Sequence, residues 1–167
     1  MALKVPRCTK CSDPNELKTL PSVNGLDGPL QLTVLEVPVL GCAKKHKAPV
    51  HRDFMLWLIG EIRAREAQIA AGKEEGMIFK KYLCGECGKE LASKSERRQA
   101  FPYELKYEEL APFKVQLEMP LYKCTGCGKE QLRSTKDLHG HVPMAIVGIN
   151  DAAGGVGGSR IAQAHRN

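Results

Sequence analysis

The chain contains one eight-residue pattern twice, and each copy ends in a cysteine. The copies are LEVPVLGC at residues 35–42 and LEMPLYKC at residues 117–124, so Cys124 follows Cys42 by 82 positions. A Cys-x-x-Cys pair precedes each copy. The cysteines of these two pairs are Cys8, Cys11, Cys84 and Cys87. The repetition predicts two related modules in tandem, each organised around its own cysteines.

Each copy also ends in a second pair of potential metal ligands. These are Cys124 and Cys127 in the later copy, and Cys42 and His46 in the earlier one. Thiolates on paired turns bind Zn²⁺ tetrahedrally, and four protein ligands leave no open coordination position. The sequence therefore predicts two structural zinc sites, with two Zn²⁺ as the cofactors. The eight expected ligands are Cys8, Cys11, Cys42, His46, Cys84, Cys87, Cys124 and Cys127.

The fourth ligand of the first site has three candidates: His46, His51 and, less naturally, Asp53. His46 is favoured because it follows Cys42 by four positions, close to the three-residue step from Cys124 to Cys127. His51 would require a different loop. Iron remains an alternative metal, since tetrahedral sulfur sites suit zinc or iron.

The cysteine count and the apolar runs indicate the cellular location of the protein. Seven cysteines do not fit the even count of a disulfide framework, and no secretory h-region precedes them. The longest apolar runs, 54–59 and 144–147, are too short to span a bilayer. We therefore expect a cytoplasmic protein that does not enter a membrane. The catalytic motifs sought are absent and both metal sites are closed, so no catalytic residues and no enzyme are expected.

The pattern along the chain predicts a small α+β protein stabilised by metal. We expect a zinc ribbon of antiparallel strands at 1–50, a helix and linker at 51–76, a second ribbon at 77–136 and a tail at 137–167. Residues 51–72 show an amphipathic helix whose apolar stripe is Met55, Leu58, Ile59, Ile62 and Ile69. Residues 72–76 are expected to be a charged linker, 142–149 to dock on the second ribbon, and the Gly-rich end from Ala152 to be disordered.

The second copy resembles the YgiT-type zinc finger of bacterial antitoxins. The resemblance is carried by Cys84, Cys87, Met119-Pro120, Cys124, Cys127 and Gly128. A diverged copy is carried by Cys8, Cys11, Val37-Pro38, Cys42 and His46. In that family the ribbon binds zinc and contacts the toxin, while a separate helix-turn-helix domain binds DNA. No helix-turn-helix pattern follows Cys127 here, so the resemblance implies ribbons alone.

The charge favours a protein partner over a nucleic acid. The formal charge is +6, and seven thiolates with two Zn²⁺ would lower it to about +3. We therefore expect an interaction module for an unidentified protein, with at most weak nucleic-acid binding. One alternative is a nucleic-acid-binding or transcription-associated protein that uses Lys44, Lys45, Lys47, Lys80, Lys81, Arg97 and Arg98. A second is a metal-handling protein or enzyme with an incomplete site in the first module.

Overall fold

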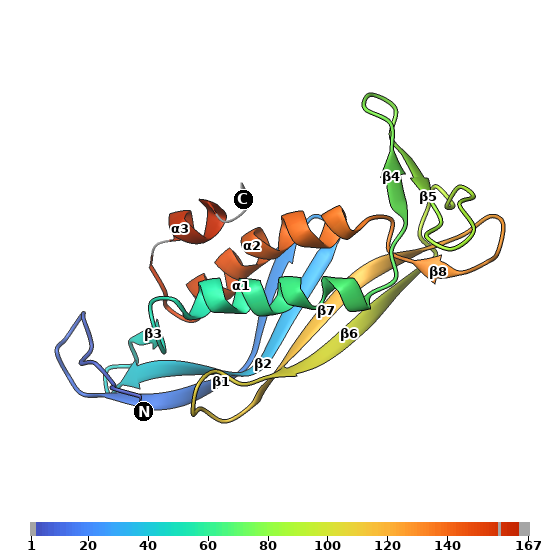
Figure 1. Cartoon of the computed structure of the whole chain (residues 1–167). Helices are drawn as coiled ribbons and strands as arrows, with labels where there is room; N and C mark the ends of the chain where they lie inside the picture. The colour runs from blue at the N-terminus through green and yellow to red at the C-terminus, as the bar shows by residue number, and fades with distance from the viewer. Residues whose placement is uncertain (1–2, 157, 164–167) are drawn as a thin grey trace.

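The protein is a small α+β protein with a mostly antiparallel sheet (Figure 1). The structure is a computed structural model that describes residues 3–156 and 158–163. Four long strands lie in the order β1-β2-β7-β6, with the short β3 beside β2 and the short β8 beside β7. β4 and β5 form a separate two-stranded hairpin. The strands are β1 (Asn15–Asp27), β2 (Leu30–Cys42), β3 (Lys47–Pro49), β4 (Lys73–Glu75), β5 (Lys81–Leu83), β6 (Arg97–Leu105), β7 (Phe113–Lys123) and β8 (Glu130–Gln131). The helices are α1 (Phe54–Ala64), the 3₁₀ turn η1 (Glu66–Gln68), α2 (Thr135–Ala152) and α3 (Gly158–Gln163).

The repeat in the sequence appears in the fold as an approximate two-fold arrangement. A long hairpin, a short strand and a helix follow each other in the same order twice, as β1-β2-β3-α1 and as β6-β7-β8-α2. β2 and β7 pair antiparallel, with Thr33 opposite Gln116 and Val34 opposite Val115. With the 82-residue offset between the copies, Thr33 corresponds to Val115 and Val34 corresponds to Gln116. Exchanging the two copies therefore converts the first of these residue pairs into the second. The two hairpins therefore meet edge to edge about an approximate two-fold axis.

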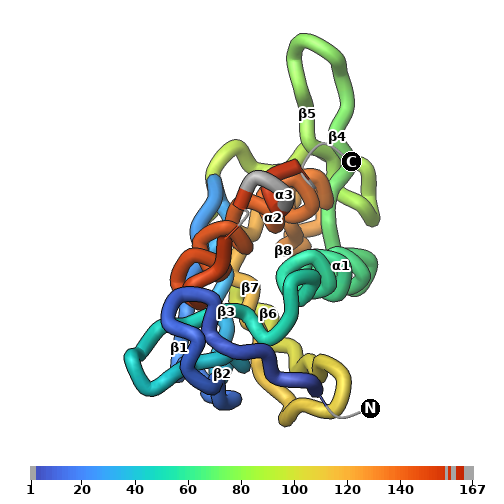
Figure 2. The backbone as a smooth tube through the Cα atoms, turned by 90° about the vertical axis from the view of Figure 1, so that its left-hand side faces the viewer, coloured from blue at the N-terminus to red at the C-terminus, as the bar shows by residue number. Residues whose placement is uncertain are grey.

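Each helix covers the hairpin of the other copy. α2 packs on β1 and β2, and the absence of a side chain at Gly25 permits this contact. A Cβ on Gly25 would lie 2.0 Å from the carbonyl oxygen of Ala145 in α2. In turn, α1 places the ring of Phe54 5.8 Å from that of Phe113 in β7. Both helices lie on the same face of the sheet and contact each other (Figures 1 and 2).

The exchange of helices produces one continuous hydrophobic core across both copies. Alternate residues of β2 and β7 point toward the helices and are fully buried. These residues are Leu32, Val34, Val115 and Leu117. Large apolar side chains buried in this way each contribute about 1.5–3 kcal/mol. Each hairpin thus buries its apolar face with the help of the neighbouring copy.

The first helix is shorter than its pattern indicated. α1 ends at Ala64, and η1 follows it, so the helix does not run to Gly72. Its expected apolar stripe is confirmed, because Met55, Leu58, Ile59 and Ile62 are buried. Ile69 is also buried, but it contacts the core from beyond the helix.

The segment expected to be a tail is largely a buried helix. α2 begins after Ser134, whose side chain accepts a hydrogen bond from the backbone N–H of Lys136, and it docks on β1 and β2 rather than on the second hairpin. Pro143 obscured this helix in the sequence because proline cannot donate to the carbonyl four residues earlier. Here Arg63 of α1 donates to that carbonyl, on His139, at 3.0 Å. A neighbouring helix thus satisfies the group that proline leaves unpaired.

The expectation of disorder from Ala152 onward can be compared with the structure only for the residues that the structure describes. Residues 158–163 form α3, and Ile161 is buried in the core, so this part of the expectation is wrong. Residues 157 and 164–167 lie outside the described residues. The residues of the expected linker at 72–76 also take a defined form, because Lys73–Glu75 is strand β4 and pairs with β5.

Candidate metal centres

The structure brings the eight expected ligands into two groups of four. We call Cys8, Cys11, Cys42 and His46 cluster 1, and Cys84, Cys87, Cys124 and Cys127 cluster 2. Within each cluster the ligand atoms all lie within 4.8 Å of one another. Each cluster forms where the second long strand of a hairpin ends, at Cys42, the last residue of β2, and at Cys124, directly after β7. Because β2 and β7 are antiparallel, the clusters lie at opposite ends of the sheet.

The separations within cluster 2 match those of a tetrahedral metal site. The Sγ atoms of Cys84 and Cys127 are 3.7 Å apart, and those of Cys87 and Cys124 are 3.3 Å apart. Metal–sulfur bonds of about 2.3 Å place sulfur atoms roughly 3.8 Å apart in a tetrahedron. All four ligands are cysteine, so the site could hold a metal ion with no position left for substrate.

Two equivalent turns build cluster 2. In each turn the cysteine N–H donates to the carbonyl five residues on, at 2.7 Å from Cys84 and 2.9 Å from Cys124. The glycine four residues on donates back to the cysteine carbonyl, at 3.1 Å in both turns. These glycines, Gly88 and Gly128, have φ of 76° and 78°, a conformation that glycine adopts without strain. The Cys-x-x-Cys-Gly sequence therefore specifies this turn locally.

In cluster 1 the imidazole of His46 could supply the fourth ligand. Nδ1 of His46 lies 3.5 Å from Sγ of Cys8 and 3.6 Å from Sγ of Cys42, and Sγ of Cys11 lies 3.6 Å from Sγ of Cys42. Bonds of about 2.3 Å to sulfur and 2.0–2.1 Å to nitrogen give a tetrahedral edge of roughly 3.5 Å. His46 is thus placed as the sequence predicted.

The other two candidates for the fourth ligand of cluster 1 have a different role. Nδ1 of His51 accepts a hydrogen bond from the backbone N–H of Asp53 at 3.2 Å, next to the start of α1. The side chain of Asp53 lies 3.8 Å from the same nitrogen. These two residues therefore interact with each other at the helix start.

One residue that hydrogen-bonds to cluster 2 could not be predicted from the sequence. Gln131 in β8 is 2% exposed, and its Nε2 donates to Sγ of Cys84 at 3.1 Å. Its Oε1 accepts the backbone N–H of Gly85 at 2.9 Å. The glutamine therefore connects a ligand to the turn that carries it, as residues around metal sites commonly do. A lone glutamine near a cysteine pair gives no indication of this role.

Hydrogen bonds prepare one thiol in each cluster for metal. The backbone N–H groups of Cys87, the Gln131 amide and the N–H of Glu86 lower the pKa of Cys84 to about 6. In cluster 1 the backbone N–H of Lys10 is the main cause that lowers the pKa of Cys8 to about 6. A thiol with such a pKa is largely thiolate at neutral pH, and thiolate is the form that binds metal.

The basic residues of the nucleic-acid alternative do not form one surface. Lys44, Lys45 and Lys47 lie near cluster 1, while Arg97 is at the end of β6 nearer cluster 2. Several of the seven are paired with carboxylates. The pairs are Lys44–Asp13, Lys80–Glu74, Arg97–Glu130 and Arg98–Glu118.

Comparisons of the chain with protein-family models, with curated proteins and with solved structures found no match. Within the described residues, no helix is both long and apolar enough to cross a membrane.

Proposed function

We propose that both clusters hold zinc and that the protein is a non-enzymatic, cytoplasmic interaction module built from two zinc ribbons. The four thiolates of cluster 2 and the three thiolates and one imidazole of cluster 1 are donor sets that zinc prefers in structural sites. Each set is complete without a substrate or water. This closure supports a structural role for both metals over the metal-handling or enzymatic alternative.

The observation that carries the interaction role is an apolar finger. We define the finger as residues 73–83, which comprise β4, β5 and the turn between them. At its tip Met77, Ile78 and Phe79 are 96%, 86% and 86% exposed. The finger projects away from the sheet and both helices (Figures 1 and 2). Three adjacent large apolar side chains held in water are typical of a contact site for another macromolecule.

The finger is ordered before any partner arrives. Its two strands pair from Lys73 with Leu83 to Glu75 with Lys81. At its base the Glu74 carboxylate lies 3.1 Å from Nζ of Lys80 and 3.6 Å from Nζ of Lys136 in α2. Leu83 is followed directly by the ligand Cys84, so a metal in cluster 2 would anchor one strand. Such preorganisation lowers the entropic cost of binding.

The family resemblance is compatible with this role. In YgiT-type antitoxins the ribbon contacts the toxin, and the finger is attached to the cluster that carries the resemblance here. We propose that the finger inserts its three apolar side chains into a hydrophobic pocket of a protein partner.

The test is capture of partners by the zinc-loaded chain. Proteins retained from a lysate of the native host are identified, and the strongest is purified for direct titration. Replacing Met77, Ile78 and Phe79 by serine should abolish that binding, because burying each side chain contributes about 1.5–3 kcal/mol. The control is Leu17→Ser, which removes a half-exposed leucine at the cluster 1 end of β1. If the triple serine variant, with its zinc content unchanged, binds the partner as tightly as the parent, the finger is not the contact site.

A further inference from the structure

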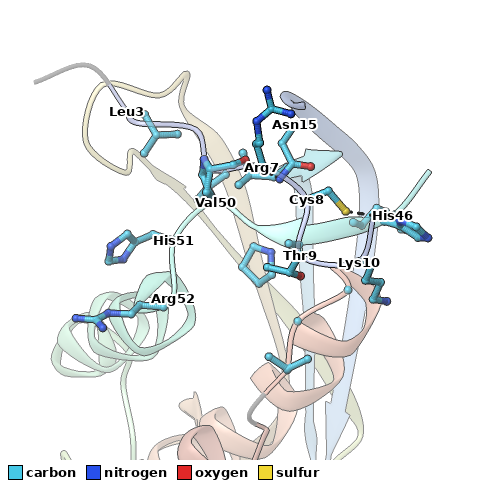
Figure 3. Close-up of a pocket in the computed structure, with 18 of the residues that line it drawn as sticks. Leu3, Arg7, Cys8, Thr9, Lys10, Asn15, His46, Val50, His51 and Arg52 are labelled. Atoms are coloured by element: carbon cyan, nitrogen blue, oxygen red, sulfur yellow. Dashed lines mark hydrogen bonds between the residues drawn. The ribbon is translucent and has the colours of Figure 1, made fainter. Parts of the chain in front are cut away.

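A cavity of about 820 Å³ lies beside cluster 1 (Figure 3). Three segments that are distant in sequence enclose it: residues 3–10, residues 46–52, and the end of α2 with residues 154–156. Cys8 and His46 border it on the metal side. Its volume is in the range of about 300–1,000 Å³ that is typical of sites for small organic molecules. The cavity is separate from the finger, so a ligand held in it would bind independently of the proposed partner.

Part of the cavity wall is apolar. Leu3, Leu40, Val50 and Val156 line it, and Leu40 and Val50 are buried. A wall of this kind favours the hydrocarbon part of a ligand through burial of apolar surface. An inorganic ion alone would leave it unused.

The charged residues of the wall are almost all of one sign. Five cations line the cavity: Lys4, Arg7, Lys10, Lys47 and Arg52. The only described carboxylate in the wall is Glu108. Lys4, Lys10 and Lys47 make no ion pair with any residue that the structure describes. In the close-up Arg52 and Lys10 lie on opposite sides of Thr9, and the guanidinium group of Arg52 points away from it (Figure 3). The excess of cations complements a negatively charged ligand.

A buried hydrogen-bond donor in the wall lacks an acceptor. Asn150 of α2 is 2% exposed and lines the cavity. Its Nδ2 has no hydrogen-bond partner among the described residues. Leaving such a group unsatisfied is unfavourable. Gly155 packs its backbone against this amide, where a Cβ would lie 2.0 Å from Oδ1. The backbone at Gly155 thus lies against the amide, and a ligand oxygen that reaches Nδ2 would supply the missing acceptor.

We propose that this cavity binds a small organic anion, a carboxylate or phosphate ester with an apolar body. The cations attract the anionic group, the apolar wall takes the hydrocarbon part, and Asn150 donates to a ligand oxygen. Both possible anionic groups share this chemistry, and titration with one ligand of each kind distinguishes them.

A metal in cluster 1 would support one wall of the cavity. Residues 3–10 belong to no strand or helix. They are held by the hydrogen bonds from Asn15 Nδ2 to the Pro6 carbonyl and from Cys8 N–H to the Asp13 carbonyl, at 2.8 Å and 2.9 Å. A metal bound by Cys8 would add a further attachment. Ligand and metal should therefore stabilise each other's binding.

The experiment is calorimetric titration of the full, zinc-loaded chain with octanoate, its uncharged analogue octanamide, and adenosine monophosphate. We expect at least one of the two anions to bind with a Kd below about 1 mM, and octanamide to bind about tenfold more weakly than octanoate if octanoate is the one that binds. Binding of octanoate alone identifies a carboxylate amphiphile, and binding of the nucleotide alone a phosphate ester. If neither anion binds, or if octanamide binds as tightly as octanoate, the proposal is wrong.

Variants locate the binding in this cavity. Lys4→Glu and Arg52→Glu change exposed residues of the wall and should each weaken anion binding about tenfold. Lys94→Glu makes the same charge change between cluster 2 and β6, and should leave the affinity unchanged. Asn150→Leu should also weaken binding. If this buried variant does not fold, the affinities of Lys4→Glu and Arg52→Glu still test the location. As a second readout, the bound anion should slow transfer of zinc from cluster 1, but not cluster 2, to a chelator. Equal affinities for Lys4→Glu, Arg52→Glu and the parent would place the anion elsewhere.

Discussion

Gln131 offers the sharpest test of how cluster 2 is stabilised. Gln131→Leu keeps the approximate size of a side chain that is 2% exposed, and it removes both polar contacts. Cys84 loses a donor at 3.1 Å, and the N–H of Gly85 loses its acceptor. A hydrogen bond to a charged group contributes about 1.5–3 kcal/mol, and an unsatisfied buried N–H costs about 1–3 kcal/mol. The metal-free protein also loses part of this stabilisation, and only the remaining difference lowers the affinity for metal. We therefore expect zinc affinity at cluster 2 to fall about 10–100-fold.

The assay for Gln131→Leu must separate the two clusters. Zinc is withdrawn by a graded series of chelator concentrations, and the freed thiols are alkylated and mapped by mass spectrometry. Cys84, Cys87, Cys124 and Cys127 should become reactive at lower chelator concentration than in the parent, while the cysteines of cluster 1 should not. Gln68→Leu, at an exposed position in η1, is the control. A change of less than about threefold at cluster 2, or an equal change at both clusters, would refute a specific role for this glutamine.

Three further outcomes are expected. Elemental analysis should find close to two zinc ions per chain; a single metal, or mainly iron, would contradict the two-zinc proposal. His46→Ala should release zinc from cluster 1 to a chelator while cluster 2 keeps its metal, and His51→Ala should keep both; the reverse pattern would make His51 the ligand. Gly25→Ala should lower the free energy of unfolding in urea by about 1–3 kcal/mol, because its Cβ would meet the helix backbone at Ala145. The control is Gly60→Ala, because a Cβ at Gly60 would meet no atom within 4 Å, and it should stabilise α1 by about 0.5–1 kcal/mol. If Gly60→Ala loses as much stability as Gly25→Ala, crowding at Gly25 is not the cause.

The local features of this protein could be read from the sequence because short segments determine them. A Cys-x-x-Cys-Gly run specifies a turn through its own backbone hydrogen bonds and through glycine at positive φ. The apolar stripe from Met55 to Ile62 specified the buried face of α1. His46 was found by counting positions from Cys42, since the ligand must return to the same metal after a turn.

The contacts between distant segments could not be read in this way. Pro143 and the glycines at 140 and 148 made α2 impossible to predict from its own sequence. The carbonyl that proline leaves unpaired accepts a hydrogen bond from Arg63, which is far away in the sequence. Gln131 became part of cluster 2 only because β8 pairs with β7 and returns beside Cys84. The cavity likewise depends on three separate segments meeting beside cluster 1.

The sequence by itself determined the two sets of potential metal ligands and the repeated pattern that carries them. Only the tertiary structure decided how the duplicated units combine, with β2 paired to β7 and each helix laid on the hairpin of the other copy. The physical reason is that a small hairpin with one apolar face cannot bury that face alone. The same apolar residues could have been covered by the helix of their own copy, and the choice depends on the sheet register and on close contacts such as that between Gly25 and Ala145.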